Sequence, residues 1–319
     1  MTLSADQHNP KALNYLGVIY EEGKYIKRDI VKAIKYYSMA SNQGFPSSQY
    51  ALGLIYLKGK FVKKDIGMAI KLLQLSAKKE FRDAQLSLAH LYLEGKYIKC
   101  DIEKAISLYK EVSSLNNQYA KNNLGVIYKK GFNENEKDVG RAIEYFKEAI
   151  RQKNDVISKY NLANVYLDIE DKNSENYKKS LSLLLESIEQ GLSISQNLLC
   201  VLFIHKYGYI DFETERKSRY YDGSYTTFEI IEKELNVSSK ESIELSVKIC
   251  NQFEKMLENE LKNFSFEEIF DFYRNADLIY TNEQVVSTTN FDDKPLINIE
   301  VGSIKNINEL FYEGFGKDI

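Results

Sequence analysis

The chain has 319 residues, of which 44% are hydrophobic and 28% are charged, and its formal net charge is −3. This apolar fraction and this balance of charge exclude a disordered chain, and the lack of net positive charge gives no reason to expect a nucleic-acid partner. Three prolines, no tryptophan and 24 tyrosines predict long helices in which tyrosine is the main large core residue.

Nothing in the sequence indicates secretion or insertion into a membrane. No apolar run approaches the roughly 20 residues that a membrane-spanning helix needs. Residues 1–8 contain neither a basic segment nor an apolar segment of a signal peptide. The three cysteines, Cys100, Cys200 and Cys250, are far apart and odd in number, so they predict neither a disulfide framework nor a zinc site. The expected compartment is therefore the cytoplasm.

An internal repeat organises the first two-thirds of the chain. Four similar stretches end in tyrosines spaced 36 residues apart, at Tyr20, Tyr56, Tyr92 and Tyr128. Each tyrosine is followed by a glycine and then by an aspartate, namely Gly23 and Asp29, Gly59 and Asp65, Gly95 and Asp101, and Gly131 and Asp138. A fifth unit around residues 162–166 is weaker, and a partial sixth unit begins at Gly191. A period of this length indicates stacked supersecondary units.

Each unit reads as two helices joined by a short turn. In the first unit, an apolar face at helical spacing comprises Leu13, Leu16, Gly17, Ile19 and Tyr20, and a second comprises Ile30, Ala33, Ile34 and Tyr37. The small residues Gly17 and Ala33 are expected to let the two helices approach closely. Gly23 is expected to end the first helix, and Asp29 to cap the second. We expect the four repeated aspartates to be helix caps rather than metal ligands.

The first unit carries the full pattern in Ala12, Leu16, Gly17, Tyr20, Gly23, Asp29, Ala33, Tyr36, Tyr37 and Gly44. This pattern resembles Sel1-like repeats, which are relatives of tetratricopeptide repeats. The resemblance implies an all-α fold, a right-handed α-α superhelix of about five units and a partial sixth over residues 1–206. Tyr25, Phe61 and Tyr97 depart from the second glycine of the family's usual turn. The family usually serves as adaptors or assembly platforms.

The resemblance also predicts where a partner binds. Stacked helix pairs leave a concave face that the first helices line. By analogy with tetratricopeptide arrays, the predicted protein-binding residues on that face are Asn14, Val18, Tyr50, Leu54, Leu86, His90, Asn122, Val126, Tyr160 and Asn164. Their mixture of aromatic, aliphatic and amide side chains suits a protein or peptide partner. The alternative is that the chain's own C-terminal extension covers this face.

Residues 207–319 do not continue the repeat and form the predicted C-terminal extension. They are expected to be mainly helical, with a long helix over 238–264 and another from Ser265 to about Ile279. A β-hairpin is expected at residues 219–226, around an Asp-Gly turn, and a short strand at 297–301. The extension is expected either to close the open end of the solenoid or to bind a partner.

The N-terminal residues align with the end of a second helix. Residues 1–9 match the tail of such a helix at an offset of 36 residues, which suggests an array that starts midway or an end that meets a partner. The alternative is a short frayed end. If the match is structural, residues 3–8 are helical and pack on Tyr15 and Leu16.

The sequence contains no constellation typical of catalysis, metal binding or cofactor binding. The three histidines, His8, His90 and His205, form no metal-binding pair, and no phosphate-binding loop is present. The leading hypothesis is a non-catalytic scaffold or adaptor that binds a protein or peptide. One alternative is a specific inhibitor of the immunity type that uses the extension. A third, an enzyme with its site in residues 207–319, has the least support. The oligomeric state stays open.

Overall fold

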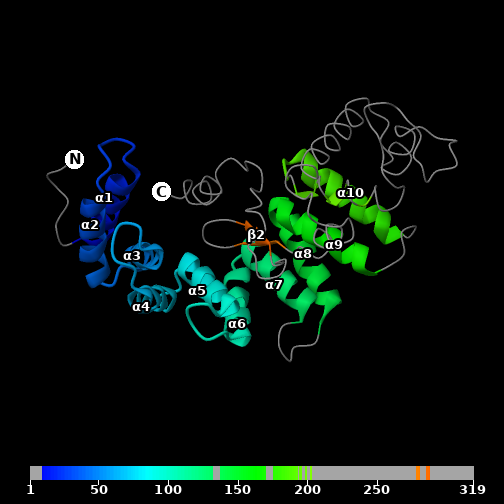
Figure 1. The fold of residues 1–319 in the computed structure, drawn as a ribbon, viewed down its shortest axis with the longest axis horizontal. Helices are drawn as coiled ribbons and strands as arrows, with labels where there is room; N and C mark the ends of the chain where they lie inside the picture. The colour runs from blue at the N-terminus through cyan, green and yellow to red at the C-terminus, as the bar shows by residue number, and fades with distance from the viewer. Residues whose placement is uncertain are drawn as a thin grey trace, which may run out of the picture. The chain divides into compact units, whose positions relative to one another are not determined.

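The structure is a computed structural model that describes residues 9–131, 137–169, 175–192, 194–195, 198–199, 202, 278–280 and 285–287 (Figure 1). The chain divides into two compact units, Met1–Ala120 and Lys121–Ile319. This division differs from the predicted boundary after residue 206, because three of the repeat helices lie wholly in the second unit. The predicted boundary therefore stays a prediction.

Ten helices and one two-stranded sheet make up the described part of the chain (Figure 1). The helices are α1 (Pro10–Glu22), α2 (Ile30–Asn42), α3 (Pro46–Lys58), α4 (Ile66–Ala77), α5 (Arg82–Glu94), α6 (Ile102–Ser113), α7 (Gln118–Lys130), α8 (Val139–Lys153), α9 (Val156–Ile169) and α10 (Glu175–Glu189). In the first unit, each helix from α1 to α5 packs against the helix that follows it. The odd-numbered helices are the first helices of the repeats, and the all-α prediction for the repeats is confirmed.

Aspartates cap the second helices of the first four repeats, as predicted. The Oδ1 atom of Asp29 accepts a hydrogen bond from the backbone N–H of Lys32 at 3.0 Å. The same bond recurs at Asp65, Asp101 and Asp138, over distances of 2.9–3.0 Å. Each carboxylate satisfies an N–H group of the first turn that has no partner within its helix.

Glycines end the first helices in a left-handed conformation. Gly23 has a φ of 69°, and its N–H donates to the carbonyl of Ile19. Gly59, Gly95 and Gly131 have φ values of 64–68°. A side chain would be strained in this conformation, which explains the glycine at the same place in four successive repeats.

In three repeats, a large buried side chain of the second helix lies on a glycine of the first helix. The ring of Tyr37, which is 2% exposed, lies over Gly17, where an added Cβ would stand 2.5 Å from the Cδ1 atom of Tyr37. Leu73 takes the same place over Gly53, and Phe146 over Gly125. Gly17 therefore makes room for Tyr37, and Ala33, the small residue predicted to share this contact, is fully buried.

The predicted apolar face of the first helix needs one correction. Leu13 is 1% exposed and belongs to the core, as expected. Ile19, which was placed on the same face, is 37% exposed. Ile19 follows Leu13 by six residues, so with 3.6 residues per turn its side chain projects about 120° away from that of Leu13 around the helix axis.

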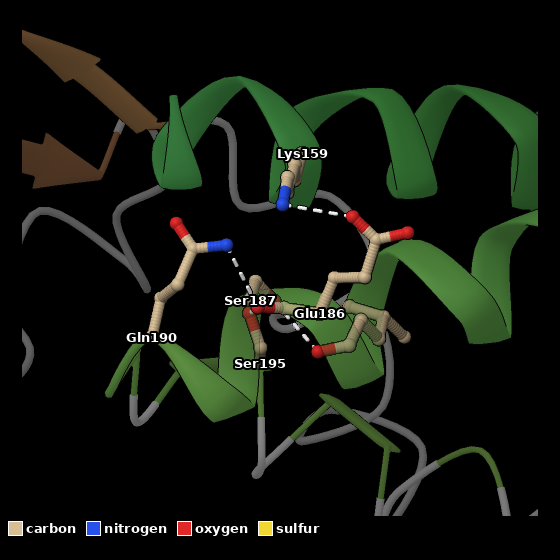
Figure 2. A network of polar contacts seen from close by, with 6 residues as sticks. Lys159, Glu186, Ser187, Gln190 and Ser195 are labelled. Atoms are coloured by element: carbon tan, nitrogen blue, oxygen red, sulfur yellow. Dashed lines mark hydrogen bonds and ion pairs between the residues drawn. The ribbon is translucent and has the colours of Figure 1, made fainter. Parts of the chain in front are cut away.

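In the second unit, polar contacts join α9, α10 and the start of the sixth repeat (Figure 2). The Nζ atom of Lys159 in α9 lies 2.8 Å from the Oε2 atom of Glu186 in α10. The hydroxyl oxygens of Ser187 and Ser195 are hydrogen-bonded at 2.6 Å. Both serines are fully buried, so this bond ties the end of α10 to the segment after Gly191.

The described part of the C-terminal extension is an antiparallel pair of strands, β1 (Leu278–Tyr280) and β2 (Val285–Ser287). Leu278 pairs with Ser287, and β1 packs against α9. The helix predicted to run to about Ile279 is therefore wrong at its end, because residues 278 and 279 lie in a strand. The predictions for residues 1–8, 207–264 and 297–319 lie outside the described residues.

Candidate functional site

Six of the predicted concave-face residues belong to the first unit. Asn14 and Leu86 are buried, with 9% and 8% of their surface exposed. The other four, Val18, Tyr50, Leu54 and His90, are half-buried. These four retain a partly accessible surface of aliphatic, aromatic and imidazole groups, and their predicted role in binding stays a prediction.

The other four predicted residues belong to the second unit and are fully buried. Asn122, Val126, Tyr160 and Asn164 each have 0% of their surface exposed. None of them is an open contact residue in this structure. For Asn122 the covering group is visible, because strand β1 lies on it.

Asn122 and a second asparagine hold the backbone of Leu278 between them. The Nδ2 atoms of Asn122 in α7 and Asn161 in α9 both donate to the carbonyl oxygen of Leu278, at 2.8 and 2.7 Å. The backbone N–H of Leu278 donates to the Oδ1 atom of Asn161 at 2.8 Å. One side chain thus pairs with both peptide groups of a residue, as a neighbouring strand would. We call Asn122 and Asn161 the asparagine clamp.

Two further residues hold the clamp in its orientation. The Oδ1 atom of Asn122 accepts hydrogen bonds from the Nδ2 atom of Asn161 at 2.8 Å and from the hydroxyl of Ser158 at 3.0 Å. Ser158 itself lies in the first turn of α9, which the Oδ2 atom of Asp155 caps through the Ser158 N–H. Because its oxygen is engaged on both sides, the Asn122 amide presents its nitrogen to the strand.

The clamp contacts extended backbone rather than a particular polar side chain. Its three bonds to Leu278 all involve backbone groups, which every residue except proline offers. The Leu278 side chain is fully buried, so the site also encloses one apolar side chain. Backbone hydrogen bonds combined with an apolar pocket are a recurring mode of peptide recognition.

The sequence pointed to Asn122 but not to Asn161 or Ser158. Asn161 stands among the apolar residues of α9, at the position that Ala51 occupies in the second repeat. A completely buried asparagine within such a stretch must find hydrogen-bond partners. An asparagine in this apolar stretch therefore indicates a hidden hydrogen-bond partner. The sequence does not reveal that this partner is a strand more than one hundred residues away.

Within the described part of the chain, the groups that carry chemistry in other proteins are isolated from one another. Burial lowers the pKa of His90, and its Nδ1 atom has no hydrogen-bond partner in the described part of the chain. Cys100 is exposed. Within the described ranges, no three His, Cys, Asp or Glu side chains gather as a metal site would require. The described helices also include none that combines the length and apolarity needed to cross a bilayer.

Comparison with known protein families identifies the repeats. Residues 10–45, 46–81, 82–117 and 118–154 each match the Sel1 repeat. These boundaries coincide with the helix pairs α1–α2, α3–α4, α5–α6 and α7–α8. The predicted resemblance is confirmed for four units.

Solved structures of Sel1 repeat proteins are similar to this chain. One is a Sel1 repeat protein from Oxalobacter formigenes, with 27% identity, a TM-score of 0.56, and coverage of 63% of this chain and 82% of that one. Another is c5321, a protective antigen of uropathogenic Escherichia coli with an SLR fold, also with 27% identity and a TM-score of 0.56. That match covers 64% of this chain and 43% of the antigen, which is less than half its length. A search of curated proteins finds no match.

Proposed function

Because residues 10–154 form four Sel1 repeats, we propose that the chain is a non-catalytic scaffold that binds extended segments of another protein through its first helices. Sel1 repeats commonly mediate protein–protein interactions, and repeats of this kind are typically non-catalytic. The residues proposed to carry binding are the asparagine clamp in the second unit and the half-buried residues Val18, Tyr50, Leu54 and His90 in the first.

The observation that carries this proposal is the seating of Leu278 in the asparagine clamp. The strand lies more than one hundred residues from α9 in the sequence, and the backbone of Leu278 makes two hydrogen bonds with Asn161 of α9 and one with Asn122 of α7. A surface that holds one extended segment of its own chain by backbone groups has the chemistry to hold a similar segment of another chain.

The energetics of the clamp favour a partner over an empty site. Asn122 and Asn161 are completely buried beneath the strand. Without an occupant, their amide groups would have to be hydrated, and a poorly hydrated buried amide costs about 1–3 kcal/mol. An extended segment that replaces the strand recovers the same hydrogen bonds.

A synthetic peptide that copies residues 274–290 tests the proposal in the full-length chain. Leu278→Pro removes the backbone N–H that donates to Asn161 and so unseats the chain's own strand. We expect the fluorescent peptide to bind the Leu278→Pro chain at least about tenfold more tightly than the unaltered chain, because the clamp is then vacant. Fluorescence anisotropy measures both affinities.

Two controls separate clamp binding from adhesion elsewhere. Adding Asn161→Leu to the Leu278→Pro chain is expected to abolish the gain in affinity. A peptide N-methylated at the residue that copies Leu278 is expected to bind about tenfold more weakly, since it lacks the donor for Asn161. Equal binding of the peptide to the chains with and without Asn161 would refute the proposal.

The alternative functions have less support than the scaffold. An inhibitor that acts through the extension and an enzyme with a site in residues 207–319 both depend mainly on residues outside the described ranges. The cytoplasmic location and the lack of a cofactor likewise stay predictions. None of these alternatives has an observation as direct as the seated strand.

A further inference from the structure

The turns between the two helices of the first three repeats carry cations beside aromatic rings. These turns, residues 23–29, 59–65 and 95–101, contain eight Lys or Arg side chains, all of them exposed, against three carboxylates. Their aromatic residues are Tyr25, Phe61 and Tyr97, the departures from the family's usual glycine. The fourth repeat differs, because residues 131–138 contain two glutamates and one lysine besides the capping aspartate. The basic character is therefore not a requirement of the repeat fold.

Contacts between successive turns join them into one surface. The guanidinium carbon of Arg28 lies 5.7 Å from the centre of the Phe61 ring, in the next repeat. The Nζ atom of Lys64 lies 4.9 Å from the centre of the Tyr97 ring and donates a hydrogen bond to the Tyr97 hydroxyl at 3.1 Å. A lysine of the same turn also lies 5.3–5.5 Å from the centre of each of the three rings. We call residues 23–29, 59–65 and 95–101 the basic patch.

The cations of the basic patch lack carboxylate partners within the described part of the chain. None of the eight takes part in an ion pair there. The three carboxylates of the patch, Asp29, Asp65 and Asp101, are engaged as helix caps. The hydrogen bond from Lys64 lowers the pKa of Tyr97, which agrees with an excess of positive charge beside the ring. The patch therefore presents this excess to the solvent.

The positive charge extends over the first unit as a whole. Residues 1–120 contain 18 Lys or Arg against 11 Asp or Glu, although the complete chain has a formal net charge of −3. Complementary charge attracts a partner and fixes its orientation. An occupant of the basic patch is therefore expected to carry carboxylates or phosphates.

The carboxylates of a protein suit this surface better than the phosphates of a nucleic acid. Glu22 and Glu94 are exposed directly before two of the turns. A nucleic acid has a phosphate at every nucleotide and would meet these like charges, whereas a protein segment can place its acidic side chains opposite the cations alone. Tyr25 and Phe61 are 78% and 46% exposed, and such rings accept apolar side chains at protein interfaces.

We propose that the basic patch binds an acidic segment of a partner protein. The carboxylates of that segment lie against the lysine and arginine side chains, and its apolar side chains lie against Tyr25 and Phe61. The proposal goes beyond the asparagine clamp, which belongs to the second unit and contacts backbone groups. The two surfaces are therefore tested with different peptides.

The probe is a fluorescein-labelled dodecapeptide that repeats Glu-Glu-Leu, added to the full-length chain. Fluorescence anisotropy measures its affinity at about 50 mM and about 500 mM NaCl. We expect binding at the lower concentration and binding about tenfold weaker at the higher one, because salt screens exposed charges. A strand of nine thymidines, which carries a similar charge, and vesicles of phosphatidylserine and phosphatidylcholine are expected to bind more weakly than the peptide.

Two triple variants test whether the peptide binds at the basic patch. The patch variant removes the lysine next to each ring, and it combines Lys24→Ala, Lys60→Ala and Lys96→Ala. The control variant removes one exposed lysine from the second helix of each of the same repeats, and it combines Lys35→Ala, Lys71→Ala and Lys110→Ala. We expect the patch variant to bind the peptide about tenfold more weakly and the control within about twofold of the unaltered chain. Because all six lysines are exposed, thermal melting should show both variants folded.

Three results would overturn the proposal. Equal losses on the two variants would show that the peptide responds to net charge alone. Tighter binding of the thymidine strand or of the vesicles would assign the patch to a nucleic acid or to a membrane surface. A peptide that does not bind would point to the chain's own extension as the occupant, since residues 207–319 contain 23 Asp or Glu against 12 Lys or Arg. None of these results bears on the peptide that tests the clamp.

Discussion

A single glycine decides how closely the two helices of the first repeat approach. Gly17 lies beneath the buried ring of Tyr37, with 2.5 Å from its added Cβ position to the nearest ring carbon. We expect Gly17→Leu to reduce the free energy of unfolding by about 1–3 kcal/mol, because the new side chain would overlap the buried Tyr37 ring and force the packing to shift. Urea denaturation followed by circular dichroism measures the change.

Gly67 provides the control for that substitution. It is an exposed helical glycine in α4, and the nearest atom to its added Cβ lies 3.6 Å away. Gly67→Leu is expected to leave stability unchanged or to raise it by about 0.5–1 kcal/mol, through helix propensity. Equal losses from both variants would show that the cost at Gly17 does not come from the Tyr37 ring.

The stability of the chain is expected to depend on pH through one partly buried carboxyl group. Burial raises the pKa of Asp83, in the first turn of α5, to about 6, against a partial opposing effect of Arg82. The protonated form is therefore favoured by folding. Its contribution to stability is complete below the ordinary aspartate pKa and is lost as pH rises through about 6.

The variant Asp83→Asn, which stays neutral at every pH, isolates this contribution. We expect its melting temperature to exceed that of the unaltered chain at pH 7–8 and the difference to shrink steadily down to about pH 4. Calorimetry across this range measures the difference. A difference that does not change with pH would contradict the raised pKa of Asp83.

At the scale of helices and strands, buried lysines join the first and second helices of the second unit. The side chain of Lys159 is 3% exposed and meets Glu186, which is 50% exposed (Figure 2). Lys121 and Glu148 form the same contact one repeat earlier, at 2.8 Å. Removing only one residue of such a pair destabilises the fold, because the remaining buried charge has no partner.

Two substitutions of this pair are expected to have different effects. Lys159→Met keeps the packing of the alkyl chain and removes the charge, so stability should be unchanged or slightly higher. Glu186→Gln leaves the buried ammonium unpaired and should cost about 1–2 kcal/mol, a limited loss because Glu186 is half exposed. Denaturant titration measures both variants. A larger loss from Lys159→Met than from Glu186→Gln would contradict this account.

How far the elements are predictable depends on the range of the interactions that form them. The helices follow from local rules, since Asp29 caps the second helix through a residue three positions away and Gly23 ends the first helix by its own conformation. Strand β1 has no such local determinant. Leu278 lies near the end of the helix predicted from Ser265 to about Ile279, yet its backbone binds Asn161, far away in the sequence. Half of the clamp was therefore predictable, and its occupant was not.

At the scale of the whole chain, the repeats are coupled through neighbouring helices. In the first unit, α1 packs with α2, α2 with α3, α3 with α4, α4 with α5, and α5 with α6. The equivalent core positions of Tyr37, Leu73 and Tyr109 are all fully buried. A stack of this kind approximates a one-dimensional array, in which each repeat is stabilised by its own packing and by its interfaces with adjacent repeats.

This arrangement predicts that damage to one repeat stays local. Leu73→Ala removes a fully buried side chain of α4 and should cost about 2–5 kcal/mol of packing in the second repeat. Native-state hydrogen exchange is expected to show the largest loss of protection in α3 and α4, smaller losses in α2 and α5, and the smallest in α1 and α6. Leu75→Ala, at a side chain 42% exposed on the same helix, is the control and should change little. If only neighbouring repeats are coupled, the loss of protection becomes smaller with distance from the substituted repeat. A uniform loss from α1 to α6 would instead mean that the first unit unfolds as one block.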